Sequence, residues 1–193
     1  MTGLFGGTFN PPHIGHMILA EYSLHELSLD KVIFIPSGMP PHKSQGSKPQ
    51  DLPGCETRYK LTVLATCGNS MFEVSDYETK KSGLSYTIDT LRHFDKILRG
   101  EMIFLMGMDS FNDLKNWKDS EDIINNFTLG MWRRPGGDMS GNVSDYPEIR
   151  RINAPEIPVS SSLIRKNIRE GKPYRYLVPE KVYAYINAMD LYL

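Results

Sequence analysis

The feature that most constrains the fold is a glycine-rich turn near the N-terminus, in the segment GGTFNPPHIGH at residues 6–16. A short apolar run at Thr2–Phe5 precedes this segment and predicts a strand, and Met17 begins a run that is typical of a helix. Glycines let backbone N–H groups approach an anion closely, and the free N–H groups of a first helical turn point to the same place. The segment therefore predicts a phosphate site where a strand passes into a helix.

The polar side chains of this segment fit the same interpretation. His13 and His16 are three residues apart, so they share one face of a helical turn, and each imidazole can donate a hydrogen bond to a phosphate oxygen. The alternative is metal ligation, but helical metal sites more often use a spacing of four, and neither a cysteine nor a carboxylate accompanies the pair. The expected phosphate-binding set consists of Gly6, Gly7, Thr8, Phe9, His13 and His16.

Strands and helices alternate along the rest of the chain. Lys31–Pro36 is nearly all apolar, which is typical of a parallel strand that is buried on both faces. Further strands are predicted at Met71–Ser75, Glu101–Gly107 and Phe127–Trp132, an irregular one at Ile149–Pro158, and helices over Cys55–Gly68, from Ser85 to Gly100, from Ser160 to Gly171 and over Val178–Met189. This alternation predicts an α/β fold: a Rossmann-like, doubly wound, mainly parallel sheet with helices on both faces, in a single domain over residues 1–193.

Composition narrows the range of partners and compartments. The chain has 193 residues and a net charge of -1, so the chain as a whole has no excess of positive charge that would attract nucleic acid or an anionic membrane. Its two cysteines do not make a secreted disulfide framework. Neither a signal-peptide pattern nor a membrane-spanning apolar run is visible, so we expect a cytoplasmic protein with no membrane partner. The sequence leaves a homo-oligomer open.

A second candidate anion site lies near the C-terminus, in the segment VSSSLIR at residues 159–165. A serine cluster at a helix start adds hydroxyl groups to the free N–H groups there, and Arg165 follows one turn later. Ser161, Ser162 and Arg165 could therefore hold a phosphate tail. The alternative is an ordinary capped helix with a solvated arginine.

Other candidates follow the ends of predicted strands, where open α/β sheets bind ligands. Gly107 and Asp109 end one strand, and Asp109 could accept a hydrogen bond from a ribose hydroxyl or cap a helix. Lys43 follows another strand and is either a phosphate contact or a solvated lysine. Trp117 could stack on a flat ring or pack in the core. Arg134 could bind a phosphate or a carboxylate in bidentate fashion, or form a surface salt bridge.

Two of these motifs resemble those of a known superfamily. The segment at residues 6–16 resembles the GGTFDPxHxGH signature of the nucleotidyltransferase α/β phosphodiesterases, and the segment at residues 159–165 resembles their ISSTxIR motif. Asn10 stands where the superfamily usually has Asp, and we expect it still to cap the helix start. The string His-Ile-Gly-His also occurs in class I aminoacyl-tRNA synthetases, but this chain is too short for one and has no second lysine-serine signature.

The middle of the chain resembles one subclass, the bacterial nicotinate mononucleotide adenylyltransferases. Its pattern GxD…L..W…I matches Gly107, Asp109, Leu114, Trp117 and Ile123, although the family usually has a small residue in place of Met108. The strings PPHK at 40–43 and RPG at 134–136 also resemble family elements.

The resemblance implies transfer of AMP from ATP to nicotinate mononucleotide in NAD biosynthesis, with Mg²⁺ accompanying ATP. It implies catalytic roles for His13, His16 and Arg165, ATP contacts from the two phosphate motifs together with Gly107 and Asp109, and substrate contacts from Lys43, Thr87, Trp117 and Arg134. Thr87 could hydrogen-bond the nicotinate carboxylate near a helix N-terminus, or simply begin that helix.

The phosphate motifs are common to all subclasses, so they cannot select the acceptor. A related nucleotidyltransferase acting on nicotinamide mononucleotide, on 4′-phosphopantetheine or with CTP stays open. A non-catalytic nucleotide sensor is a further alternative, which the complete set of His13, His16 and Arg165 disfavours.

Overall fold

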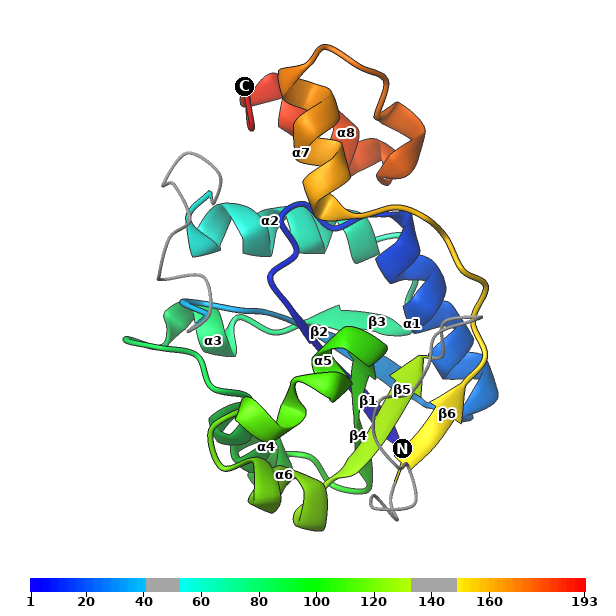
Figure 1. Ribbon diagram of the computed structural model, residues 1–193, viewed down its shortest axis with the longest axis vertical. Coiled ribbons are helices and arrows are strands. Elements are labelled where there is room, and N and C mark those ends of the chain that lie inside the picture. Colours follow the sequence, from blue (N-terminus) through cyan, green and yellow to red (C-terminus); the bar gives the residue numbers. More distant parts are fainter. Residues whose placement is uncertain (41–52, 133–148) are drawn as a thin grey trace.

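The computed structural model describes residues 1–40, 53–132 and 149–193, and a single parallel sheet organises them (Figure 1). Its strands are β1 (Thr2–Gly7), β2 (Lys31–Pro36), β3 (Phe72–Val74), β4 (Met102–Gly107), β5 (Thr128–Trp132) and β6 (Ile149–Ile152). The α-helices are α1 (Ile14–Glu26), α2 (Cys55–Thr66), α3 (Tyr77–Lys80), α4 (Thr87–Ile97), α5 (Met108–Asn112), α6 (Ser120–Asn126), α7 (Ser161–Arg169) and α8 (Glu180–Ala188), with 3-10 turns at Leu114–Asn116 and Arg175–Leu177. The predicted α/β fold is confirmed.

The order of the strands across the sheet fixes where a ligand can bind. The order is β3-β2-β1-β4-β5-β6, and each neighbouring pair is parallel. The chain therefore winds outward from β1 to β3, returns to place β4 beside β1, and winds outward again to β6. In such sheets ligands bind at the carboxyl ends of the strands where the winding reverses. Here β1 ends at Gly7 and β4 ends at Gly107, so the two predicted glycine positions meet at this point.

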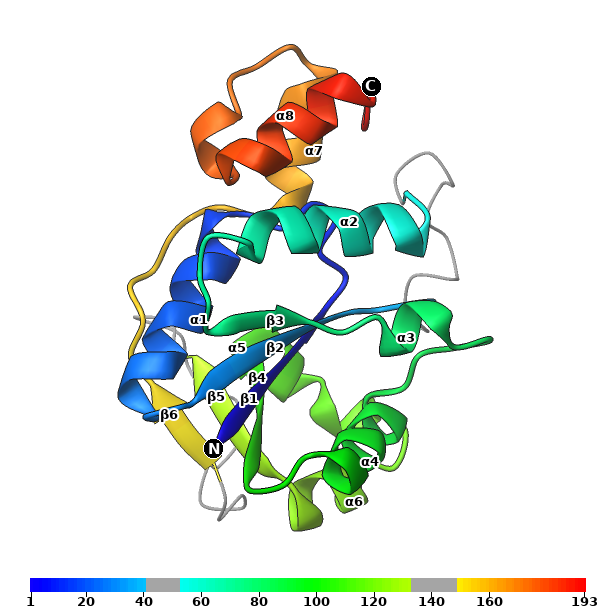
Figure 2. The ribbon, with the colours of Figure 1, turned by 180° about the vertical axis from the view of Figure 1, so that it is seen from behind.

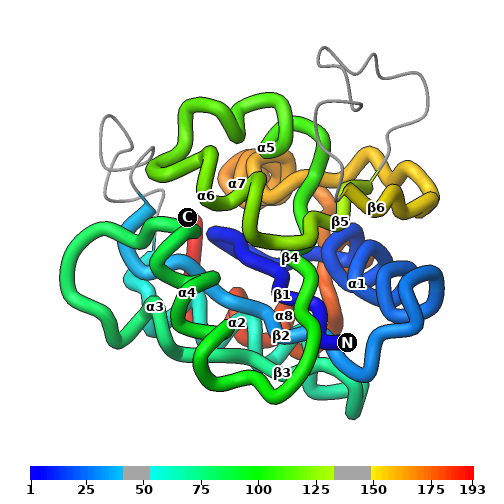
Figure 3. The backbone as a smooth tube through the Cα atoms, turned by 90° about the horizontal axis from the view of Figure 1, so that it is seen from below, coloured from blue at the N-terminus to red at the C-terminus, as the bar shows by residue number. Residues whose placement is uncertain are grey.

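Helices cover both faces of the sheet because successive side chains of a strand point to opposite sides. In β1, Leu4 packs in the apolar layer that contains residues of α4 and α6, whereas Phe5 packs in the layer that contains Ala20 of α1. The two layers explain why α1 and α4 lie on opposite sides of the central strands (Figure 3). Burial of strand residues on both faces also explains the nearly continuous apolar runs in the sequence.

The C-terminal helices α7 and α8 pack against α2 rather than against the sheet, as both ribbon views show (Figures 1 and 2). A third apolar cluster joins Leu61 of α2 to Ile164 of α7 and to Val182 and Ile186 of α8. Because this cluster fixes α7 against α2, the start of α7, which carries the serine cluster, lies beside the loop that follows β1.

Two of the differences between the predicted and the observed boundaries bear on the site. Helix α1 begins three residues earlier than predicted, with His13 as its N-cap, so His16 lies in the first turn. The last strand, β6, ends at Ile152, and residues 153–160 have no regular secondary structure. Within the described ranges, no helix is both long enough and apolar enough to cross a membrane.

Candidate active site

Two glycines allow the loop between β1 and α1 to fold as it does. A Cβ atom on Gly7 would lie 2.9 Å from the ring of Phe9, and one on Gly15 would lie 3.0 Å from Nδ1 of His13. Phe9 has a φ of 48°, and its ring packs back into the core with 2% of its surface exposed. Any contact of Phe9 with ATP must therefore come from its backbone.

The two histidines form a stacked pair at the start of α1. Their ring centres are 3.7 Å apart with an interplanar angle of 29°. The backbone N–H of His13 donates a hydrogen bond to Nδ1 of His16, with 3.1 Å between the nitrogens. Because Nδ1 of His16 accepts this bond, the proton of the neutral imidazole resides on Nε2, where it can be donated to a ligand.

Burial keeps both imidazoles neutral in the ligand-free protein. It lowers the pKa of His13 to about 4, and burial together with the neighbouring His13 lowers the pKa of His16 well below its usual value of 6.5. Nδ1 of His13 is buried and finds no hydrogen-bond partner among the described residues. The pair is therefore a preformed donor site for an anion, whose negative charge would favour the protonated forms.

Because His13 is kept neutral by burial, we expect the stability of the fold to decrease at acidic pH. In the unfolded chain His13 takes up a proton near pH 6.5, whereas the native state keeps it neutral down to about pH 4. Its contribution to stability is complete above pH 6.5 and is lost as the pH falls towards 4, because the unfolded state then binds more protons. We expect His13 to lower the free energy of unfolding by about 2 kcal/mol between pH 7.5 and pH 5.

Urea denaturation at these two pH values measures that loss. In His13→Asn the loss should be smaller by about the same 2 kcal/mol, since asparagine does not titrate. Titrating groups away from the pair, including the buried Glu78, act equally in both proteins and cancel in the comparison. The pKa of His16 loses the lowering by His13 in the variant but keeps the larger lowering by burial, so the difference between the two proteins reports mainly on His13. A variant with the same pH dependence as the wild type would show that His13 is not neutral in the native state.

The serine cluster and Arg165 are attached to the loop that follows β1. Oγ of Ser161 donates to the carbonyl oxygen of Pro11 at 2.8 Å, and Nη1 of Arg165 donates to the carbonyl oxygen of Asn10 at 2.8 Å. Nη2 of Arg165 donates to Oγ of Ser162 at 3.3 Å, which leaves the Ser162 hydroxyl proton for a ligand. Nε of Arg165 is buried and has no partner among the described residues. The structure thus brings together the two predicted phosphate motifs, which are about 150 residues apart in the sequence.

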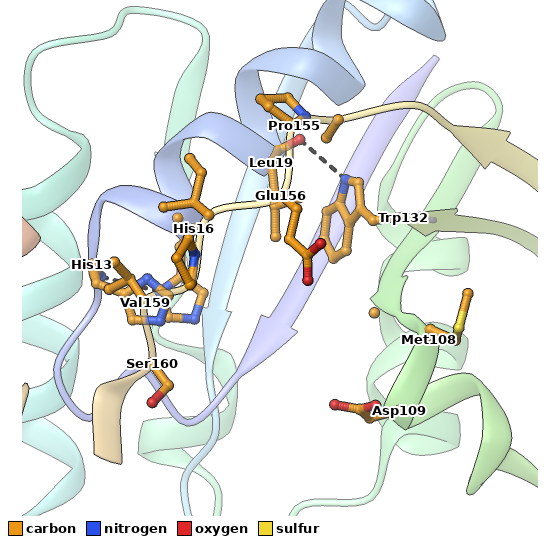
Figure 4. Close-up of a pocket in the computed structure, with 15 residues that line it drawn as sticks. His13, His16, Leu19, Met108, Asp109, Trp132, Pro155, Glu156, Val159 and Ser160 are labelled. Carbon is orange, nitrogen blue, oxygen red and sulfur yellow. Dashed lines mark hydrogen bonds between the residues drawn. The ribbon is translucent and has the colours of Figure 1, made fainter. Parts of the chain in front are cut away.

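A first pocket of about 480 Å³ lies between these motifs and the end of β4 (Figure 4). Its lining includes the predicted residues His13, His16, Gly107 and Asp109. The histidines lie on one side of the pocket and Asp109 on the other. The N-cap of α5 is Gly107, so the alternative that Asp109 caps this helix is wrong.

A second pocket of about 270 Å³ adjoins the same loop. Its lining includes Gly6, Gly7 and Thr8, from β1 and the loop that follows it. It also includes Thr87, the first residue of α4, and Trp117, which follows the 3-10 turn at Leu114–Asn116. The indole Nε1 of Trp117 donates to Oδ2 of Asp113 at 3.3 Å, which holds the ring in place. The glycine turn therefore separates a pocket that contains the histidines from one that contains the tryptophan.

Lys43 and Arg134 lie outside the described residues. The expectation that Asn10 caps α1 is wrong, because His13 occupies the N-cap position. Asn10 is instead buried, and its Oδ1 accepts a hydrogen bond of 2.9 Å from the hydroxyl of Tyr192, next to the C-terminal residue of the chain. The sequence contains no local signal for a contact that spans 182 positions.

Sequence reasoning missed further residues that line the two pockets or hold the loops around them. Arg58 of α2 is 1% exposed and donates to carbonyl oxygens of the loops after β1 and β2. Glu78 is buried in the wall of the second pocket. Trp132 lines the first pocket, and its Nε1 donates to Oγ of Ser23 at 2.9 Å. An arginine and a glutamate within helical patterns look like solvated surface residues, so the sequence gives no reason to place them at a site.

Comparison with known proteins agrees with this geometry. The family model described as "Cytidylyltransferase-like" matches residues 4–167. The chain belongs to this family. A protein of Desulfitobacterium hafniense named "Probable nicotinate-nucleotide adenylyltransferase" is 39% identical over 199 residues, covering 98% of this chain and 94% of that protein. A protein of Clostridium novyi with the same name is 39% identical and is covered to 98%.

Solved structures of the same class share the fold. The structure of "Plasmodium falciparum nicotinic acid mononucleotide adenylyltransferase complexed with NaAD" superposes with a TM-score of 0.82 at 17% identity, over 99% of this chain and 96% of that one. The match to the family model, which extends across both phosphate motifs, confirms the resemblance to the superfamily that those motifs indicate.

Proposed function

We propose that this protein transfers the adenylyl group of ATP to nicotinate mononucleotide, giving nicotinate adenine dinucleotide and pyrophosphate. The observation that carries the proposal is the pair of adjoining pockets at the carboxyl ends of β1 and β4, where the winding of the sheet reverses. Both take residues from the loop after β1 and from the start of α5: His13 and Asp109 for the first pocket, Thr8 and Ser110 for the second. Two substrates bound there would meet at the glycine turn.

The chemistry requires positioning and charge stabilisation rather than a covalent intermediate. A phosphate oxygen of the mononucleotide attacks the α-phosphorus of ATP in line, the bond between that phosphorus and the oxygen bridging to the β-phosphate breaks, and pyrophosphate leaves. Nε2–H of His16 and the ring of His13 would donate to the α-phosphate as charge develops on its oxygens. Ser162 and the guanidinium group of Arg165 would take the β- and γ-phosphates and so stabilise the leaving group.

The second pocket suits the acceptor. Trp117 offers a face on which a pyridine ring can stack. Thr87 is the first residue of α4, where free backbone N–H groups and the helix dipole favour a negative charge such as the nicotinate carboxylate. The names of the relatives, nicotinate-nucleotide adenylyltransferases, support this choice of acceptor.

Mg²⁺ is proposed to enter with ATP. Two carboxylates, Asp109 and Glu156, belong to the described lining of the first pocket, and carboxylate oxygens suit this hard cation. Among the described residues, no three His, Cys, Asp or Glu side chains lie close enough together to hold a metal ion. The ion would therefore be bound largely by phosphate oxygens and water, with Asp109 or Glu156 as a single protein contact, and it would supply charge neutralisation on the phosphates.

Pyrophosphate release from Mg-ATP tests the proposal. With purified protein, nicotinate mononucleotide should support release at least tenfold faster than nicotinamide mononucleotide at equal subsaturating concentration, because only the former carries the charge that the start of α4 favours. Identification of nicotinate adenine dinucleotide by mass spectrometry confirms the product. Equal rates with the two acceptors would contradict the assignment of Thr87 and Trp117.

The same assay separates the alternatives. Release only with 4′-phosphopantetheine would identify a different acceptor on the same ATP site. Binding of ATP without release by any acceptor would indicate a nucleotide sensor. The cytoplasmic location stays a prediction from the sequence, which leaves a homo-oligomer open.

A further inference from the structure

The loop that follows β1, residues 8–13, is held by side chains from the C-terminal part of the chain. Ser161 and Arg165 of α7 bind carbonyl oxygens of this loop. Tyr192 differs from them because it binds a side chain: its hydroxyl donates to Oδ1 of Asn10 at 2.9 Å, and the end of the chain lies beside the loop (Figure 3). The carbonyl oxygen of Asn10 accepts from Nη1 of Arg165. Asn10 is therefore held at two points, by Arg165 and by Tyr192.

The turn after α8 brings Tyr192 to this position. The backbone N–H of Leu191 donates to the carbonyl oxygen of Ile186 at 3.0 Å, and Asp190 has a φ of 48°. These features are typical of a Schellman turn at the C-terminus of a helix. Tyr192 has a positive φ as well, of 72°. A bulky residue rarely adopts this left-handed conformation unless the contacts around it fix it there, so the packing of Tyr192 determines its backbone.

The environment of the Tyr192 side chain makes its hydrogen bond a firm one. Its ring packs in the apolar cluster that α2, α7 and α8 share, and both Tyr192 and Asn10 are buried. Burial raises the pKa of the Tyr192 phenol, although the charges of Arg165 and Arg58 act in the opposite direction, so the hydroxyl remains a donor at neutral pH. A buried amide oxygen that loses its donor is costly, so Asn10 stays where Tyr192 places it.

We propose that Tyr192 is a positioning residue for adenylyl transfer, which acts by fixing Asn10 and with it the loop after β1. This inference rests on the proposed function, because it concerns the groups that act on ATP. His13 follows Asn10 by three residues, and Arg165 binds Asn10 directly. A fixed Asn10 thus sets the donor to the α-phosphate relative to the donor to the leaving group. Tyr192 is not among the described residues that line either pocket, so it acts through Asn10 rather than on a substrate.

Tyr192→Phe tests the proposal because it removes the hydroxyl and keeps the ring in the cluster. We expect kcat to fall about tenfold while KM for ATP and for nicotinate mononucleotide stays within about twofold, because the direct contacts remain and only their alignment changes. In the NMR spectrum of the backbone amides, the signals of His13 and Gly15 should shift, since the loop has moved. A wild-type kcat, or a loss confined to KM, would show that Tyr192 does not position the reacting groups.

A double-mutant cycle shows whether Tyr192 acts through Asn10. Asn10→Ala removes the acceptor and should lower kcat by a similar factor. Adding Tyr192→Phe to Asn10→Ala should then change kcat by no more than about twofold, because the bond is already lost. If the two losses multiply in the double variant, the two residues act independently and the inference is wrong.

Two variants of α8 provide matched controls. Tyr185→Phe also removes a hydroxyl group from a tyrosine packed against the same cluster, and Ile186→Val removes a methyl group from its buried part. Both should keep kcat within about twofold of wild type, although Ile186→Val lowers stability. If Ile186→Val lowers kcat as much as Tyr192→Phe does, the effect of Tyr192 is one of stability and the inference is wrong.

The amide signals separate this inference from the proposed function. If the wild type releases no pyrophosphate with any acceptor, the adenylyltransferase proposal fails. The signals of His13 and Gly15 then still decide whether Tyr192 positions the loop. They should shift in Tyr192→Phe and stay in place in Ile186→Val, and unchanged signals in Tyr192→Phe would overturn the inference.

Discussion

Replacing His16 with alanine should reduce kcat by about 10²–10³, the scale that is lost with one preorganised donor to a developing charge. His16 is expected to have this effect because its proton is fixed on Nε2 by the bond that Nδ1 accepts from the backbone of His13. Burial keeps the ring neutral, so the donor is present over the whole neutral pH range. Steady-state pyrophosphate release gives kcat, and calorimetry with ATP shows whether ground-state binding is retained.

His16→Ala removes a hydrogen-bond donor and also removes the packing of the ring, so a second variant is needed to separate the two effects. The His16 ring packs against Phe5 and Phe9, with ring centres 5.9 Å and 5.1 Å apart, so alanine also leaves a small cavity. His16→Asn keeps an amide that can accept from the backbone N–H of His13 and can donate to phosphate. It should therefore recover part of the lost rate. If His16→Ala folds and turns over within a few-fold of wild type, His16 is not a donor to the transition state.

Features that lie near one another in the sequence could be placed from the sequence alone. The glycine turn and the two histidines lie within eleven positions, and apolar runs located the strand before them and the next strand, whereas the start of α1 was predicted three residues too late. The alternation of strands and helices predicts parallel strands whose carboxyl ends share one edge of the sheet, but it does not fix the order of the strands. The structure places β4 beside β1, so that Gly7 and Gly107 end neighbouring strands.

Contacts between distant segments could not be assigned in this way. Tyr192 reaches Asn10, and Lys118 faces Tyr86, through the packing of whole helices rather than through any local pattern. The expectation that Asn10 caps a helix came from residue preference alone, and the tertiary contact with Tyr192 overrides that preference. Arg58 illustrates the same limit, since only its burial distinguishes it from the exposed Lys60 on the same helix.

Arg58 connects the two loops that form the walls of the second pocket. Its Nη1 donates to the carbonyl oxygen of Thr8 at 2.9 Å and its Nη2 to that of Gly38 at 2.8 Å. Its Nε donates to the carbonyl oxygen of Pro53 at 3.2 Å. The loop after β1, the loop after β2 and the start of α2 are thus held by one planar group. Lysine cannot reproduce this arrangement because its ammonium is a point charge without the guanidinium fork.

Arg58→Met should therefore lower the free energy of unfolding by about 3–5 kcal/mol, since it removes three charge-assisted hydrogen bonds and leaves partly buried carbonyl groups without this partner. Urea denaturation measures the loss, and an unchanged m-value shows that the folded state keeps its compactness. At a temperature where the variant is folded, KM for the mononucleotide should rise more than KM for ATP, because Thr8 and the neighbours of Gly38 line the second pocket.

Lys60→Met on the same helix provides the comparison, because an exposed side chain that is replaced changes stability by no more than about 0.5 kcal/mol. Arg58→Lys should fall between the two variants, since it keeps a buried charge but satisfies fewer carbonyl groups. A loss below about 1 kcal/mol in Arg58→Met would mean that water replaces the guanidinium at these carbonyls. The loops of the second pocket would then be held by their own backbone contacts, such as the bonds that Gly38 and Met39 donate to Oγ of Ser85.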